Sequence, residues 1–165
     1  MKQAKHTPEP QTFSKAIHTP IGLLILRERD GEICAIDLAR ESDERPADSA
    51  ATPVLEQAAR ELAEYFAGKR TEFSFPMRAQ GTPFQTAVWD ALLNIPFGQT
   101  KTYGQIASEV ENPKGSRAVG MACNRNPIMI AVPCHRVVGA SGALTGYAGG
   151  LSVKEKLLKL EQEQK

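Results

Sequence analysis

The stretch TYGQIASEVENPKGSRAVGMACN, residues 102–124, predicts two short helices joined by a tight turn. Thr102 and Gln105 have the spacing of a capping box, in which both side chains bond free backbone N–H groups at a helix start. The run Asn112-Pro113-Lys114-Gly115 is typical of a turn, and Ser116 begins the second helix. Two short helices around a glycine-containing turn indicate a helix-turn-helix, although many ordinary helical hairpins share this pattern.

The segments on either side of this stretch are also mainly helical. A second capping box, Thr82-Pro83-Phe84-Gln85, predicts a helix that ends at Pro96 and Gly98. Ser152 and Glu155 predict a third box that opens the last helix. The glycine-rich residues 139–150 predict a tight loop, and they lack the patterns of phosphate-binding loops.

The first half predicts a small sheet with one helix. Apolar runs at 21–26 and 33–36 flank Asp30-Gly31, which is a hairpin signal. Thr52 and Pro53 are suited to the start of a helix that Gly68 ends. The alternating residues 71–75 predict one more strand, and residues 76–81 a linker. Residues 1–12 predict a loose arm, and residues 40–52 an exposed loop.

Composition and charge indicate an ordinary globular protein. The 165 residues are 41% hydrophobic and 24% charged, with no long apolar run and no signal-peptide pattern, so we expect a cytoplasmic protein without a membrane span. Residues 1–81 carry 11 Lys and Arg against 13 Asp and Glu, and residues 82–165 carry 9 against 6. The mildly basic second half permits a nucleic-acid partner without demanding one.

Cys134 and His135 are the first candidates for chemistry. They follow the apolar run 128–132, and a cysteine there is also typical of a buried thiol at a strand end. Cationic character from His135 and Arg136 would lower the thiol pKa from its free value of about 8.5 and favour the nucleophilic thiolate. Adjacent side chains on an extended segment point apart, so His135 reaches Cys134 only if the chain bends or through a bridging water, which we favour.

Glu161 is a second, independent candidate. Counted from Val153, the residues Leu157, Leu160 and Glu161 lie four, seven and eight positions further on, so the pattern places a carboxylate on the apolar face of a helix. A buried carboxylate needs a partner, and His135 is better placed than His6 or His18. The alternative is a frayed, exposed Glu161 near the end of the chain.

Motifs through the second half resemble the O6-alkylguanine-DNA alkyltransferases, or methylated-DNA–protein-cysteine methyltransferases. The run Pro133-Cys134-His135-Arg136-Val137-Val138 is similar to their active-site signature. The resemblance covers residues 81–161 in order, through GTPFQ at 81–85, IPFG at 95–98, TYGQIA at 102–107, RAVG at 117–120, NRNP at 124–127 and GYAGGL at 146–151. The first half is similar only in outline, through Thr19-Pro20-Ile21-Gly22.

This resemblance implies an α+β fold with two parts. Residues 1–78 would form a small antiparallel-sheet domain of ribonuclease-H-like type, with residues 1–12 as its arm. Residues 79–165 would form a helical, winged-helix-like domain with the helix-turn-helix, which carries alkyl transfer and DNA binding.

The resemblance also implies catalytic roles. Cys134 would accept the alkyl group, and His135 would act as a water-mediated base oriented by Glu161. Asn126 would bridge the helix-turn-helix to the active-site segment. Tyr103 would help rotate the target phosphate and donate a hydrogen bond to the leaving guanine.

DNA and base contacts are implied for further residues. Arg117 would enter the base stack beside Ala118 and Tyr103. The pocket for the guanine would be lined by Tyr147, Ala148, Val137 and Cys123. Taken alone, Asn126 is also typical of a turn, Tyr103 of a half-buried aromatic and Arg117 of a solvated cation.

The implied substrate is double-stranded DNA that contains O6-alkylguanine, with O4-alkylthymine left open. The damaged base must be flipped out before a thiolate can reach it. Transfer to sulfur gives a stable thioether, so each molecule would act once, as a monomer without cofactor or obligate protein partner. We expect no zinc site, because Cys34 is the only cysteine before Cys123. Ala148 lacks a hydroxyl that some members carry, and Cys123 leaves the fit of bulky adducts open.

Three other functions compete with this one. A non-catalytic binder of alkylated DNA would keep the fold but replace the acceptor cysteine. A winged-helix transcription regulator would explain the helix-turn-helix but not the combination of Cys134, His135 and Glu161. A cysteine hydrolase would need an oxyanion-hole pattern, which the sequence does not show.

Overall fold

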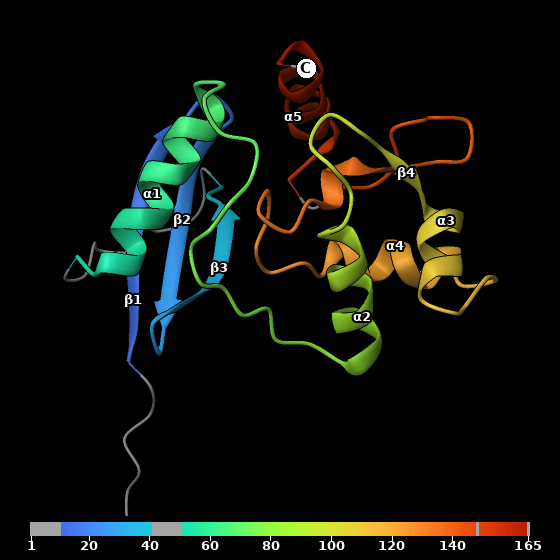
Figure 1. Cartoon of the computed structure of the whole chain (residues 1–165), viewed down its shortest axis with the longest axis horizontal. Helices are drawn as coiled ribbons and strands as arrows, with labels where there is room; N and C mark the ends of the chain where they lie inside the picture. The colour runs from blue at the N-terminus through green and yellow to red at the C-terminus, as the bar shows by residue number, and fades with distance from the viewer. Residues whose placement is uncertain (1–10, 41–50, 148, 165) are drawn as a thin grey trace, which may run out of the picture.

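The computed structural model describes residues 11–40, 51–147 and 149–164 (Figure 1). Most of the expected arm, most of the loop 40–52, and Ala148 lie outside these ranges. In Figure 1 the N-terminal strands and α1 lie on one side and α2, α3 and α4 on the other, with α5 between the two groups in this view. The mixed α+β fold predicted from the sequence is confirmed. Within the described ranges, no helix is long and apolar enough to cross a membrane.

The N-terminal sheet is antiparallel, with β1 (Thr12–Thr19), β2 (Gly22–Arg29) and β3 (Glu32–Leu38) in that order. The predicted hairpin between β2 and β3 is confirmed: Asp30 and Gly31 have φ of 52° and 79°, as a tight two-residue turn requires. Helix α1 (Pro53–Phe66) covers the sheet. Its N-terminus is capped as predicted, because the Thr52 hydroxyl accepts a bond from the Leu55 N–H at 3.1 Å.

The strand predicted over residues 71–75 is wrong. The buried carboxylate of Glu61 accepts hydrogen bonds from the Ser74 N–H at 2.6 Å and the Ser74 hydroxyl at 3.0 Å. The backbone therefore bonds to a side chain rather than to a neighbouring strand. Phe73 and Phe75 are partly buried or buried against the core, which explains the alternation without a strand. The chain instead touches the sheet at Met77, inside the expected linker, through a bridge to Ile33.

In the second half, the described residues form four α-helices and a two-stranded parallel sheet. Its elements are α2 (Pro83–Leu92), β4 (Lys101–Thr102), α3 (Tyr103–Glu109), α4 (Ser116–Asn124), the 3-10 turn η1 (Cys134–Arg136), β5 (Val137–Val138) and α5 (Leu151–Glu163). The capping boxes predicted at Thr82 and Thr102 are both confirmed. The third box is wrong: α5 begins after Gly150, whose φ is 96°, and Ser152 lies inside the helix without capping it.

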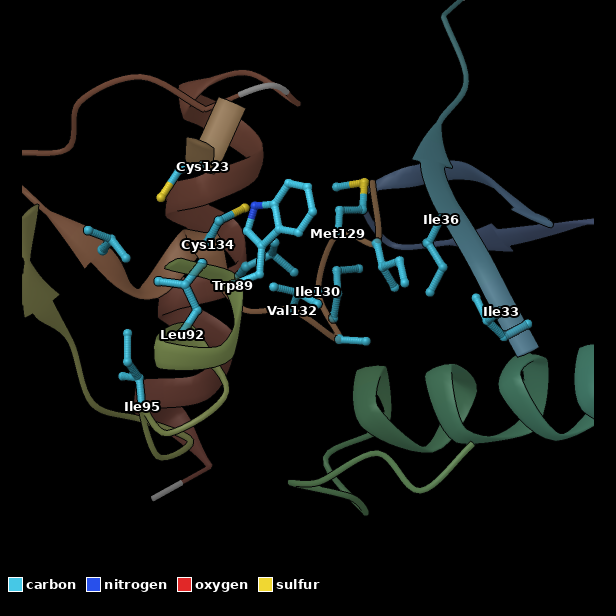
Figure 2. Packing of buried hydrophobic residues seen from close by; sticks show 14 of the residues in the cluster. Ile33, Ile36, Trp89, Leu92, Ile95, Cys123, Met129, Ile130, Val132 and Cys134 are labelled. Carbon is cyan, nitrogen blue, oxygen red and sulfur yellow. The ribbon is translucent and has the colours of Figure 1, made fainter. Parts of the chain in front are cut away.

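The two halves share one core. The Ile36 N–H donates to the Pro127 carbonyl at 2.9 Å, and the Met129 N–H donates to the Ile36 carbonyl at 3.2 Å. Figure 2 shows Met129 and Ile130 between the β3 residues and the α2 residues Trp89 and Leu92. The segment that leads to Cys134 is thus packed between both halves of the protein.

Candidate active site around Cys134

Tight turns, and not a strand, carry Cys134. The apolar run that suggested a strand end folds on itself, with the Ala131 N–H donating to the Met129 carbonyl at 2.9 Å. Ile130, at the centre of this turn, has φ of 73°, which is strained for a β-branched residue. The Cys134 N–H donates to the Val132 carbonyl at 2.8 Å in a second such turn. Burial of Ile130, which is 1% exposed, holds this backbone in place.

Asn126 connects this segment to the end of α4. Its Nδ2 donates to the Val132 carbonyl at 2.8 Å and to Sγ of Cys134 at 3.2 Å. Its Oδ1 accepts a bond from the Ile128 N–H at 3.0 Å. One amide side chain therefore fixes the loop and contacts the sulfur directly.

The thiol of Cys134 is not ionised by its neighbours in the way the sequence suggested. Burial raises its pKa, and the hydrogen bond from Asn126 and the charge of Lys154 oppose that effect only in part. Burial also lowers the pKa of His135, so His135 is a neutral imidazole rather than a cation. The charge of Arg136 is directed at Glu161. The expectation that His135 and Arg136 lower the thiol pKa is therefore wrong for this state.

Glu161 is buried and fully partnered, as its place on the apolar stripe predicted. Its Oε2 accepts a bond from His135 Nε2 at 2.6 Å, and Arg136 contacts both oxygens, with Nε at 2.7 Å and Nη2 at 3.1 Å. Burial alone would raise the pKa of Glu161, but the hydrogen bonds from His135 and Arg136 and the charge of the Arg136 guanidinium outweigh it and lower the pKa to about 2. Because the Arg136 guanidinium contacts both oxygens, the carboxylate stays ionised beside a neutral imidazole.

These contacts fix the tautomer of His135. Because the carboxylate of Glu161 can only accept, Nε2 carries the proton and Nδ1 carries the lone pair. Nδ1 is buried and has no hydrogen-bond partner among the described residues. The chain bends at this point, since Cys134–Arg136 form a 3-10 turn instead of an extended segment. The site thus holds a buried thiol beside a neutral imidazole with a free acceptor atom.

Lys154 is a member of the site that the sequence reasoning missed. It is 0% exposed, and its Nζ donates to the carbonyls of Val137 at 2.6 Å and Thr145 at 2.9 Å. Nζ also lies 3.5 Å from the hydroxyl of Tyr103, which donates to the same Thr145 carbonyl at 3.1 Å. Lys154 lies seven positions before Glu161 on α5, so helical periodicity could have placed it on the inward face.

Three of the residues expected to line the guanine pocket, Val137, Cys123 and Tyr147, fall within the described part of the chain. Val137 and Cys123 are buried, and burial, followed by the neighbouring Cys134, raises the pKa of Cys123 to about 12. Figure 2 shows Cys123 and Cys134 at the same end of the buried cluster. The hydroxyl of Tyr147 is buried and unpartnered among the described residues, and burial raises its pKa.

Arg117 lies on the outer side of α4, opposite the buried Cys123, and Ala118 is half-buried at the edge of that outer side. Arg117 is exposed, and so is Met121 one turn later, which is 65% exposed. The structure therefore separates an outward α4 surface from the buried group around Cys134. Among the described residues there is no group of three or more His, Cys, Asp or Glu side chains that could hold a metal ion.

Comparisons with known proteins match both halves. Residues 83–163 match the 6-O-methylguanine DNA methyltransferase, DNA binding domain, and residues 13–79 match the ribonuclease-like domain of 6-O-methylguanine DNA methyltransferase. A methylated-DNA–protein-cysteine methyltransferase of Methanosarcina barkeri is 46% identical over 149 residues, covering 88% of this chain and 94% of the relative. The chain belongs to this methyltransferase family.

Further relatives agree. The Methanosarcina acetivorans protein of the same name is 60% identical over 105 residues, covering 64% of this chain and 67% of its own length. The crystal structure of the Mycobacterium tuberculosis O6-methylguanine methyltransferase has a TM-score of 0.85 and 41% identity, covering 94% of this chain and 95% of that one. The Mycobacterium tuberculosis protein has also been solved in complex with DNA, at a TM-score of 0.82 and 42% identity, covering 92% and 93% of the two chains.

Proposed function

We propose that this protein repairs DNA by moving a methyl or other alkyl group from O6-alkylguanine onto Cys134. The observation that carries the proposal is the buried Cys134 beside a neutral His135 whose Nε2 is bound to Glu161 at 2.6 Å. This is the arrangement of a nucleophile with an oriented base. The relatives are named for this transfer, and one of them has been solved with DNA.

The reaction requires only Cys134, His135, Glu161, Tyr103, the alkylated base and a bridging water. The thiol proton of Cys134 passes through a bridging water to Nδ1 of His135, and Glu161 stabilises the imidazolium that forms. The thiolate attacks the alkyl carbon, a C–S bond forms, and the bond from carbon to guanine O6 breaks with its electrons staying on the base. The guanine anion then takes up a proton from water and the imidazolium of His135 gives its proton back to water, so both products are neutral. Tyr103 donates a hydrogen bond to the leaving guanine, and burial raises its pKa, so its hydroxyl keeps the proton needed to donate. The thioether has no leaving route, so one protein removes one alkyl group.

DNA binding is assigned to residues 79–165, and within them to the outer surface of α4. Arg117 fills the space left by the flipped nucleotide, beside Ala118, and Tyr103 helps to rotate the target phosphate. Tyr147, Ala148, Val137 and Cys123 line the pocket that receives the guanine. The reaction uses a reduced thiol on DNA and needs no cofactor, so we place it in the cytoplasm.

Intact mass spectrometry tests this proposal. After incubation with duplex DNA containing O6-methylguanine, we expect the protein to gain one methyl group, located on Cys134, and no more than one per molecule. A Cys134→Ser variant should gain none, and a Cys123→Ser variant should still gain one. Tight DNA binding without a mass gain would support a non-catalytic binder instead, and repeated turnover would contradict the single-use mechanism.

Replacing Arg117 by alanine should slow repair of duplex DNA far more than reaction with free O6-benzylguanine, because only the duplex requires base flipping. Flipping costs a few kcal/mol, so loss of the inserted side chain should lower the duplex rate by roughly tenfold or more. Rates are measured by quenched reactions on both substrates. Lys114→Ala, an exposed cation in the preceding turn, controls for the loss of one charge. Equal losses on both substrates would contradict the flipping role.

A further inference from the structure

We propose that Tyr65, on helix α1 of the N-terminal half, is a positioning residue for alkyl transfer. Its hydroxyl donates to Glu161 Oε2 at 2.6 Å, across a separation of 96 positions in the chain. Through Glu161 it acts on His135, the base of the reaction. This inference rests on the proposed function, and it assigns part of the active site to the half that precedes the DNA-binding region.

The carboxylate of Glu161 is bound by residues from both halves of the protein. Oε2 is shared by the Tyr65 hydroxyl, His135 Nε2 at 2.6 Å and Arg136 Nη2 at 3.1 Å. Oε1 is bound by Arg136 Nε at 2.7 Å, with the Gly98 N–H at 3.4 Å. With donors on both oxygens, the carboxylate has one allowed rotation, and His135 is oriented by a group that cannot turn.

The surroundings of Tyr65 hold its hydroxyl in this position. The residue is 0% exposed, and its ring meets Phe66, Phe73 and Phe97 at centroid distances of 5.2, 5.4 and 6.1 Å. Burial, followed by the charge of Glu161, raises the pKa of Tyr65, so the phenol remains a protonated donor.

A second close approach lies just beyond the C-terminal ends of both helices. A Cβ placed on Gly68 would lie 2.6 Å from side-chain atoms of Gln164, so only glycine fits there without displacing that side chain. Gly68 also has φ of 75°, a backbone conformation that glycine adopts without strain. The C-terminal ends of α1 and α5 therefore lie next to each other.

The direction of the effect follows from charge. Each donor on Oε2 spreads the negative charge of Glu161 and weakens its pull on the His135 proton. Removing the Tyr65 hydroxyl leaves a more basic carboxylate, which stabilises the imidazolium form of His135. The pKa of His135 should then rise, and a larger share of the base should be protonated and inactive at low pH.

Tyr65→Phe tests this, because it removes only the hydroxyl. We expect the titration midpoint of His135, followed by nitrogen NMR of labelled histidine, to rise by about one pH unit. The acid limb of the alkyl-transfer rate should shift by the same amount, with rates on that limb falling roughly tenfold. Incorporation of 3-fluorotyrosine at position 65 keeps the shape and makes a stronger donor, and it should move the midpoint down.

Phe66→Leu is the matched control, since it removes one ring beside Tyr65 while Phe73, Phe97 and the bond to Glu161 still hold the hydroxyl. It should lower the melting temperature without moving either the His135 titration or the acid limb. An unchanged titration in Tyr65→Phe, or an equal shift in Phe66→Leu, would overturn the inference. The histidine titration needs no substrate, so it decides the role of Tyr65 even if the wild-type protein takes up no methyl group and the proposed function fails.

Discussion

Replacing Glu161 by alanine should lower the free energy of unfolding by about 3–5 kcal/mol, as expected when one partner of a buried ion pair is removed. The guanidinium of Arg136 contacts both oxygens of Glu161 at 2.7 and 3.1 Å, and it would remain buried without its counter-charge. The same change should abolish measurable methyl transfer, because His135 would lose the group that fixes its tautomer. Urea unfolding and the intact-mass assay measure the two effects.

Two further variants separate stability from activity. Glu163→Ala removes an exposed carboxylate from the same helix and should change neither measurement. Combining Glu161→Leu with Arg136→Met replaces the pair by apolar side chains, which often restores stability. We expect that double variant to be more stable than Glu161→Ala and equally inactive. A single variant as stable as wild type would show that Arg136 finds another partner.

Acid should reproduce part of the effect of the Glu161 substitution. The pKa of Glu161 is lowered from its ordinary value of 4.5 to about 2, so the folded state favours the ionised carboxylate. A lowered pKa contributes stability that is fully present above pH 4.5 and is lost as the pH falls through about 2. The stability difference between wild type and Glu161→Ala should therefore be constant near neutrality and shrink in this acid window.

Short sequence patterns correctly predicted the helix caps and the hairpin turn, which form between residues close together in the chain. The caps at Thr52, Thr82 and Thr102 and the Asp30-Gly31 hairpin depend on residues within four positions of each other, and all are confirmed. Residues 71–75 alternate like a strand, but the Ser74 N–H within them donates to the side chain of Glu61. Glu61 lies 13 positions earlier, so no local pattern predicts this contact. The turns at residues 128–132 are likewise imposed by packing between the two halves.

In the active site too, features set by helical spacing were predictable from the sequence, and features set by tertiary contacts were not. Helical spacing was enough to place Glu161 on an inward face, and the same spacing could have placed Lys154. That Tyr65 bonds Glu161 depends on two helices that meet only in the folded protein. The ionisation of Cys134 was wrongly predicted from charged neighbours in the sequence, because burial and the pairing of Arg136 with Glu161 decide it.

Lys154→Met should reduce methyl transfer by roughly tenfold or more, because each unit by which a thiol pKa rises lowers the thiolate fraction about tenfold. The charge of Lys154 opposes the effect of burial on the pKa of Cys134. Burial lowers the pKa of Lys154 itself, and the neighbouring thiols Cys134 and Cys123 raise it, so the ammonium and the thiolate stabilise each other. The rates of methyl transfer and of alkylation by iodoacetamide both rise with pH as the Cys134 thiol ionises. We expect this rise to occur at higher pH in the variant.

The same substitution should also loosen the site, since the Val137 carbonyl loses the Lys154 donor at a cost of about 1–3 kcal/mol, while the Thr145 carbonyl keeps its bond from the Tyr103 hydroxyl. Lys156→Met, an exposed lysine two positions away on α5, is the control and should behave like wild type. Because Lys154 acts at the thiol and not on DNA, its loss should slow reaction with duplex DNA and with free O6-benzylguanine equally. A loss confined to duplex DNA would instead place its effect in base flipping, through its contact with Tyr103.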